Sequence, residues 1–215
     1  MKVVGLALAL GAALFLSALP ASAATVGVTY SGKVTSVSPT GTAPFAIDDT
    51  FSFTVVLDDT VPDSEPTAGL GIYWGAITQL TGSFSNGYHF AMDPAAAAGT
   101  RLGIGNDVTD GISINAGGSF SGPLVDAKPL VSVSLSFFDP TGNMLNSEGI
   151  PTDLVSVMAY STTSSMFMSF GLAGQFVYVQ GEVLSAATPI PAALPLLISA
   201  LGGLGLVGWR RRRVA

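Results

Sequence analysis

Apolar and polar residues alternate along much of the chain between positions 24 and 188. The clearest segments carry an apolar side chain at every second position, and they are 26–30 with a continuation at 34–37, 51–57, 131–137 and 166–170. A period of two residues is typical of antiparallel strands that are buried on one face. Shorter segments of the same kind predict further strands at 102–105, 111–116, 154–160 and 175–184.

Turn residues between these segments predict how the strands connect. Asn86-Gly87, at the centre of the segment 83–90, favours a hairpin with a type I′ turn. A short helix is predicted at 94–98, ended by Gly99. With about ten short strands and no longer helical period, we expect an all-β fold: an antiparallel β-sandwich or jelly roll, with a partly open barrel as the alternative.

The first residues of the chain have the pattern of a secretory signal peptide. Lys2 precedes an apolar run over 3–15 that continues to Leu19, and Pro20 then breaks the run before the small residues Ala21-Ser22-Ala23. One positive charge, a short apolar core and an A-x-A site predict a signal peptide over 1–23, cleaved after Ala23. The alternative is an uncleaved signal anchor, and in both cases the body of the protein crosses the membrane.

The end of the chain has the pattern of a membrane anchor. Residues 192–209 include no charged side chain, and Arg210, Arg211, Arg212 and Arg213 follow them directly. Eighteen residues in a helix reach about 27 Å, which is enough to span the hydrocarbon core of a bilayer. Four arginines resist translocation, so a membrane helix at 192–209 with a cytoplasmic tail at 210–215 is predicted. A buried core helix is the alternative.

The body between these ends is strongly acidic. Residues 24–188 contain three basic residues (Lys33, Arg101 and Lys128) and all 14 acidic residues of the chain, a net charge of −11 against −6 for the whole chain. We therefore expect no nucleic-acid partner. The chain has no cysteine, which excludes disulfides, thiol nucleophiles and thiolate metal sites. The mostly small residues at 185–191 predict a linker between an ectodomain at 24–184 and the anchor.

Clustered acids make Ca²⁺ the one candidate cofactor. Asp48-Asp49 precedes the predicted strand 51–57, and Asp58, Asp59, Asp63 and Glu65 follow it. A second loop holds Asn106, Asp107 and Asp110. Ca²⁺ takes six to eight oxygen ligands, so the first metal candidates are Asp58, Asp59, Asp63 and Glu65. No EF-hand pattern is present, and the alternative is that these residues form the turns between strands.

Catalytic signals are weak. The one histidine, His89, has no Gly-x-Ser-x-Gly nucleophile elbow to serve, and an ordinary strand position is its simpler interpretation. A glycosidase needs two carboxylates across a cleft, which a chain with 14 acids neither excludes nor indicates. Tyr73-Trp74 with Tyr88 form a candidate aromatic platform for sugar rings, and their alternative is a place in the sheet core or edge.

The C-terminal segment resembles the PEP-CTERM sorting signal of Gram-negative bacteria that produce extracellular polysaccharide. Residues 188–193 read Thr-Pro-Ile-Pro-Ala-Ala, a motif of the V-P-x-P-A type with Thr188 where Val is common, and an apolar segment at 194–208 and Trp209 with the arginines follow. The body is similar to an ectodomain that recurs in this family. That similarity lies in the order of the segments 30–37, 51–55, 59–63, 71–73 and 139–142.

The resemblance implies an exported protein that is a substrate of a sorting enzyme and not itself that enzyme. In the family the helix is a transient anchor, and exosortase, a membrane-embedded cysteine peptidase, cleaves near the proline motif, here Pro189, Ile190, Pro191 and Ala192. Signal peptidase and an exosortase-type peptidase are then partners, with exopolysaccharide a further candidate. We expect a non-enzymatic surface or extracellular-matrix protein associated with biofilm, held transiently in the inner membrane. A Ca²⁺- or carbohydrate-binding module is the alternative, followed by a secreted hydrolase.

Overall fold

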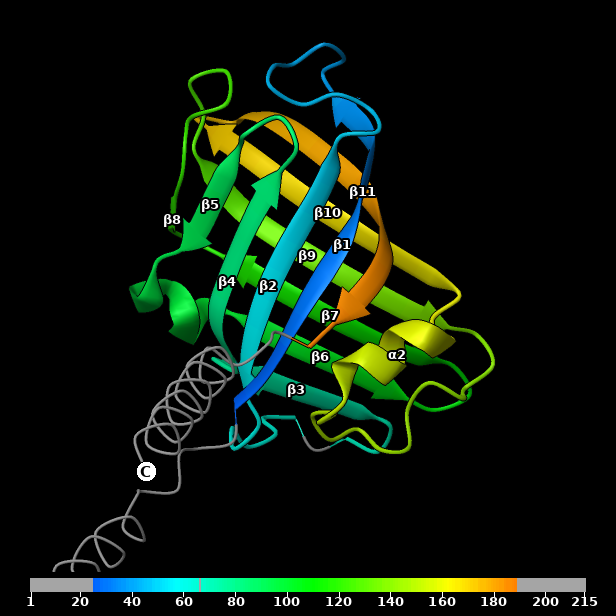
Figure 1. Ribbon diagram of the computed structural model, residues 1–215. Helices are drawn as coiled ribbons and strands as arrows, with labels where there is room; N and C mark the ends of the chain where they lie inside the picture. The colour runs from blue at the N-terminus through cyan, green and yellow to red at the C-terminus, as the bar shows by residue number, and fades with distance from the viewer. Residues whose placement is uncertain (1–24, 66, 189–215) are drawn as a thin grey trace, which may run out of the picture.

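The computed structural model describes residues 25–65 and 67–188 (Figure 1). The expected signal peptide with its cleavage residues Ala21 and Ala23, the proline motif Pro189–Ala192, the membrane helix and Arg210–Arg213 all lie outside the described residues. Within the described part, no helix is both long and apolar enough to cross a bilayer. The structure accordingly concerns the acidic body of the chain.

The body is all-β, with one 3₁₀-helix and one short α-helix. Its elements are β1 (Thr25–Ser38), β2 (Thr50–Asp58), β3 (Leu70–Trp74), β4 (Ile77–Phe84), β5 (His89–Met92), η1 (Pro94–Gly99), β6 (Arg101–Asn106), β7 (Asp110–Gly117), β8 (Phe120–Ser121), β9 (Leu130–Asp139), α2 (Leu154–Tyr160), β10 (Thr163–Leu172) and β11 (Gln175–Ala187). Strand β11 continues through Ala187, so Ser185, Ala186 and Ala187, which were expected in the linker, pair with β1 instead.

All eleven strands belong to one strongly curled antiparallel sheet, in the order β3-β6-β7-β9-β10-β11-β1-β2-β4-β5-β8. The expectation of an all-β, antiparallel fold is confirmed. Over the described residues the strands form one hydrogen-bonded sheet and not two, and this half-barrel is closer to the alternative, a partly open barrel. Figure 1 shows β1, β2 and β4 in front of β6, β7 and β9. Period two identifies a buried face, but it does not distinguish two stacked sheets from one that curls over itself.

The long strands β1 and β11 lie between the two halves of the sheet. Their pairing shifts register twice, between Ser31 and Gly32 and again between Val34 and Ser36. Such bulges bend a strand and increase its twist. A Cβ on Gly32 would lie 2.0 Å from the carbonyl oxygen of Glu182, so this close approach of two backbones requires glycine at that position. The bend therefore depends on backbone features that hydrophobic patterning does not reveal.

The inner face of the curled sheet forms a single core. Buried side chains alternate along β2 as the sequence predicts, with Phe51, Phe53, Val55 and Leu57 facing inward. On β9 a register shift opposite Ser169 leaves Val131 out of step, and Leu130 is buried in its place. The core continues without a break around the curl, from Ile104 and Ile114 on one side to Leu80 on the other.

Two local predictions need correction. The hairpin between β4 and β5 is confirmed, but its tight turn has Ser85 and Asn86 at its centre, with Gly87 following at a φ of 86°. Because Gly87 alone has a positive φ there, the turn is not type I′. The predicted strand at 154–160 is wrong: the segment is α2, whose N-cap Asp153 accepts hydrogen bonds from Val155 N and Ser156 N. The short helix predicted at 94–98 is confirmed as η1.

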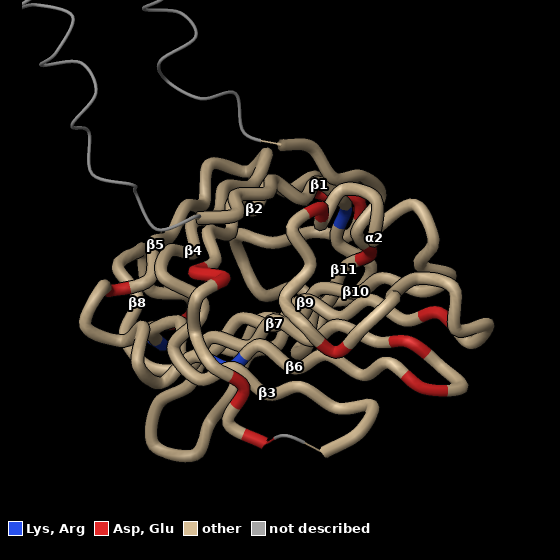
Figure 2. Tube along the Cα trace, turned by 90° about the horizontal axis from the view of Figure 1, so that it is seen from below, with Lys and Arg blue, Asp and Glu red and all other residues tan. Residues whose placement is uncertain are grey.

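Three segments cover the openings of the half-barrel. The loop 39–49 brings Phe45 into the core at one end, with its ring 5.0 Å from the rings of Phe84 and Tyr88. The segment 140–153 and α2 cover the other end, where Leu145 and Val157 are buried. Helix η1 lies against β4 and β7, at the open side between the sheet edges. Figure 2 shows that the acidic residues lie mainly in loops and at strand ends around the sheet.

Candidate functional site

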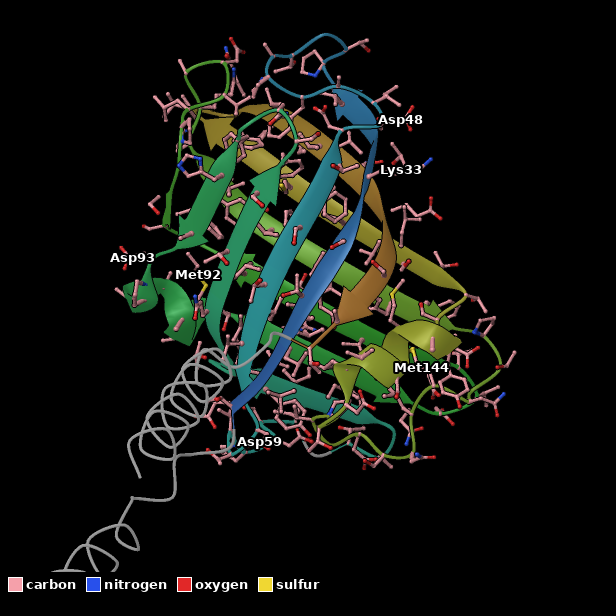
Figure 3. All side chains as sticks on the ribbon, in the orientation of Figure 1. Lys33, Asp48, Asp59, Met92, Asp93 and Met144 are labelled. Atoms are coloured by element: carbon pink, nitrogen blue, oxygen red, sulfur yellow. The ribbon has the colours of Figure 1, made fainter. Side chains whose placement is uncertain are left out.

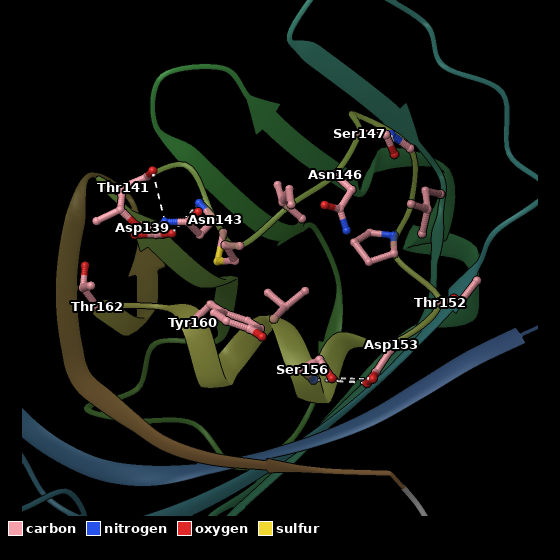
Figure 4. Close-up of a pocket in the computed structure, with 16 residues that line it drawn as sticks. Asp139, Thr141, Asn143, Asn146, Ser147, Thr152, Asp153, Ser156, Tyr160 and Thr162 are labelled. Atoms are coloured by element: carbon pink, nitrogen blue, oxygen red, sulfur yellow. Dashed lines mark hydrogen bonds between the residues drawn. The ribbon is translucent and has the colours of Figure 1, made fainter.

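A hollow in the body lies beside α2, where the segment 139–153 crosses the end of the sheet (Figure 4). Its volume is about 830 Å³, and polar side chains provide much of its wall, among them Asn143, Asn146, Thr152, Ser156 and Thr162. Tyr160 on α2, which is 58% exposed, adds an aromatic ring. A hollow of this size is large enough for a small polar molecule.

Asp139 organises one side of the hollow. Although it is only 1% exposed, its Oδ1 accepts hydrogen bonds from Thr141 N (2.9 Å) and Thr141 Oγ1 (2.7 Å), and its Oδ2 accepts one from Asn143 N (2.9 Å). These hydrogen bonds, with that of the Thr141 hydroxyl first, lower the pKa of the Asp139 carboxyl below its ordinary value of 3.8. The tight loop after β9 is therefore held by an ionised carboxylate.

Asp110 holds the next part of the same segment. It is fully buried at the start of β7, directly opposite Asp139 in the pairing of β7 with β9. Its Oδ2 accepts a hydrogen bond from Leu145 N at 2.7 Å. Asn106, with its amide oriented to match its neighbours, donates to Asp110 Oδ1 (3.2 Å) and accepts from Ser147 N (3.0 Å). The buried side chains of Asp110 and Asp139 thus accept hydrogen bonds from backbone N–H groups of the segment that covers them.

The hydrogen bonding of Asp139 argues against its acting as a general acid. A general acid needs a carboxyl with a raised pKa, whereas the pKa of Asp139 is lowered. The pKa of Asp153, at the start of α2, is lowered as well, first by the hydroxyl of Ser156. These carboxylates accept backbone and hydroxyl hydrogen bonds, which gives them a structural role. The amides and hydroxyls of Asn146, Thr152 and Thr162 also line the hollow.

The Ca²⁺ candidates are placed as turn residues. Asp58 accepts from Thr60 N (2.9 Å) and Thr60 Oγ1 (2.6 Å), and Asp63 Oδ1 accepts from Glu65 N (3.0 Å) and Ile72 N (2.9 Å). Asp59 lies at the opposite end of the sheet from Asp48 (Figure 3). Over residues 25–65 and 67–188, no three His, Asp or Glu side chains gather in a way that could hold a metal ion.

Asp63 has a role that sequence reasoning did not anticipate. Strand β3 is an edge strand of the sheet. Asp63 Oδ1 accepts from Ile72 N, and Ser64 N donates to Ile72 O at 2.8 Å, so the loop satisfies both backbone groups of Ile72 on the free edge. Covering an edge in this way prevents it from pairing with other strands. An Asp a few residues before a short strand is the only signal for this in the sequence, and it is a weak one.

The predicted aromatic platform is not formed. Tyr88 and Tyr73 are buried, at 3% and 6% exposure, and only Trp74 is exposed. Tyr88 contributes to the core near Phe45, and Tyr73 donates a hydrogen bond from its hydroxyl to Glu148 O at 2.8 Å. These side chains therefore do not share a surface. His89 is exposed at the start of β5, with Nδ1 3.2 Å from Gly87 O, as expected for an ordinary strand residue.

A different set of rings lies on the outer face, with Phe176 and Tyr178 exposed and Phe167 half-buried. Phe176 and Tyr178 project outward from β11 and stack with an interplanar angle of 10° and a centroid distance of 5.9 Å. Phe167 of β10 lies 5.5 Å from Tyr178. We call these three residues the aromatic strip. Alternation along 175–184 indicates that Phe176 and Tyr178 share a face, but only the structure shows that this face is the exposed one.

Comparison with family models, with curated proteins and with solved structures finds no match for this chain.

Proposed function

We propose that the chain is an exported, non-enzymatic surface or extracellular-matrix protein, held by its C-terminal segment until a membrane peptidase of the exosortase type releases or transfers it. The observation that carries the proposal is the apolar segment 192–209 followed by Arg210–Arg213, downstream of a folded sheet and a proline motif. The sheet begins at Thr25, two residues after the proposed signal cleavage at Ala23. It ends at Ala187, two residues before Pro189.

The first and last strands along the chain are paired, which supports a body that is attached to the membrane at one point. Thr29, near the start of β1, pairs with Ala187 at the end of β11. The chain therefore leaves the sheet on the same side toward both proposed processing sites. Cleavage at either site leaves every strand intact. The net charge of −11 on residues 24–188 keeps such a body soluble and repels it from anionic membrane surfaces once it is released.

Intact mass of the exported protein tests the proposal. In a host that carries the processing peptidase, the mature chain is expected to begin at Ala24 and to lack Arg210–Arg213, and without the peptidase the arginines should remain. Replacing Ala23→Asp should block the first cut, because signal peptidase requires a small residue there. Replacing both Pro189→Leu and Pro191→Leu should block the second. The surface change Asp107→Ala is the control and should alter neither cut.

Two results would contradict the proposal. If the mature protein keeps Arg210–Arg213 in the presence of the peptidase, the segment is a permanent anchor. If the body is recovered from the cytosol, it is not exported.

A further inference from the structure

The aromatic strip is an apolar surface on the outside of the sheet, in which the rings of Phe176 and Tyr178 are nearly parallel and that of Phe167 is tilted by 31° from Tyr178. Phe176 is 46% exposed and Tyr178 is 36% exposed, while the alternating neighbours Val177 and Val179 are buried. The ring of Phe176 lies directly over Gly171, where an added Cβ would come within 2.6 Å of the ring. Glycine at position 171 therefore allows the ring to lie flat on the backbone of β10 and not stand upright.

Polar side chains surround the strip. Exposed Gln180 follows Tyr178 on the same face of β11, and Ser169 of β10 and Ser38 of β1 are paired with Tyr178 on either side. The nearest charges along β11 belong to Glu182 and to Lys33, its pairing partner on β1. Lys33 also lies 3.5 Å from Asp48. The surface is thus aromatic at its centre, uncharged at its border and weakly acidic beyond one end.

We propose that the aromatic strip binds a neutral polysaccharide chain, which would be the extracellular partner of the exported body; this inference rests on the proposed function. A pyranose ring has a face of C–H groups that packs against an aromatic ring, and this contact removes apolar surface from water. Its hydroxyls lie at the rim, where the exposed side chains of Gln180 and Ser38 can exchange hydrogen bonds with them.

Area and charge disfavour two other occupants. At the observed exposure, Phe176 and Tyr178 offer less than roughly 200 Å², and with the half-buried Phe167 the strip stays well short of the roughly 800 Å² per partner that a stable protein interface buries. A second copy would also bring another body of charge −11. An anionic lipid surface needs a cluster of basic residues, and here Lys33 stands between Glu182 and Asp48.

Binding of the full-length chain to neutral glycans tests the proposal. The chain is purified in a polyoxyethylene detergent, which carries no sugar group, and is offered insoluble cellulose, soluble glucomannan and amylose. We expect binding to at least one of them, and we expect the double change Phe176→Ala and Tyr178→Ala to weaken it by about tenfold or more. Trp74→Ala removes another exposed aromatic residue from β3, an edge strand away from β10 and β11, and should change affinity by less than about twofold.

Gly171→Ala tests the geometry while keeping all three rings. The added methyl group should tilt Phe176 off the surface and weaken binding, and unchanged affinity would contradict a platform of flat rings. Circular dichroism of each variant verifies the fold.

Three outcomes would overturn the proposal. The chain could bind none of the three neutral glycans, it could bind phosphatidylglycerol vesicles through the strip instead, or it could form a dimer in sedimentation that depends on the strip. Measuring the processed mass of the same variants separates this proposal from the previous one. Normal export and processing without glycan binding overturns the strip alone, whereas glycan binding by a chain that stays in the cytosol overturns the export proposal alone.

Discussion

The two ends of the curled sheet are closed by different chemistry. Where Leu130 of β9 pairs with Phe170 of β10, the loop 39–49 inserts Phe45 among aromatic rings. Where Phe138 pairs with Thr163 at the other end of the same strands, the segment 140–153 is held by the carboxylates of Asp110 and Asp139. At the aromatic end a side chain of the covering loop packs into the core, whereas the hollow lies beside the segment at the carboxylate end. One covering segment is thus held by packing and the other by hydrogen bonds to its backbone.

The largest effect is expected from emptying the aromatic end. Phe45→Ala removes a ring that is 5% exposed and contacts Phe84, Tyr88 and Phe170. We expect a loss of about 3 kcal/mol in the free energy of unfolding, measured by urea denaturation. Ile47→Ala, in the same loop but 65% exposed, is the control and should change little. A small loss for Phe45→Ala would mean that the loop is not part of the cooperative fold.

A smaller loss is expected at the carboxylate end. Asp110→Ala leaves Leu145 N and the amide of Asn106 without their partner, which should reduce the free energy of unfolding by about 2 kcal/mol. Hydrogen exchange should then become faster over residues 140–153 and stay unchanged in the loop 39–49. Asp107→Ala, exposed in the same β6–β7 loop, is the matched control. Equal protection of both ends in Asp110→Ala would contradict the distinction between them.

Acid should weaken the carboxylate end selectively. The pKa of Asp139 is lowered in the folded state, so the unfolded chain takes up the proton first and stability falls with pH. The contribution is complete above the ordinary value of 3.8 and disappears as the pH falls through the lower folded pKa. Unfolding midpoints measured from pH 7 to pH 2 should fall less steeply in Asp139→Asn than in the wild type. Asp107→Asn should keep the wild-type slope, and the same slope in both variants would refute the assignment.

The smallest effects, of opposite sign, are expected from removing one hydroxyl at each end. Tyr88 OH is buried without a hydrogen-bond partner, and burial raises the pKa of Tyr88 to about 12. Tyr88→Phe should therefore stabilise the protein by up to about 1 kcal/mol. Tyr73→Phe removes the hydrogen bond to Glu148 O and should destabilise it by about 1 kcal/mol. Thermal unfolding of the two variants measures the difference, and shifts of the same sign would contradict the prediction.

Sequence reasoning worked best where a local rule decides the structure. Period two located the strands at 51–57 and 166–170, because each side chain of a strand faces one side or the other. It failed at 154–160, where Asp153 caps a helix in a segment rich in valine. It also failed for the sugar platform, because Tyr73 and Tyr88 meet different parts of the core. The hollow beside α2 was not anticipated, although all its lining residues lie between Asp139 and Thr162, because the path of this segment depends on contacts with the sheet such as the hydrogen bond from Leu145 N to Asp110.

By itself, the sequence determined the strand-forming segments, the acidic charge of the body and the apolar segments on either side of it, since these depend on side-chain type and spacing along the chain. The tertiary structure decided that the strands form one curled sheet, that Asp110 and Asp139 meet beneath one loop, and that Phe167, Phe176 and Tyr178 share an exposed face. Those relations depend on register, bulges and the direction of the curl. Contacts between residues distant in the chain determine them, and spacing along the chain does not encode them.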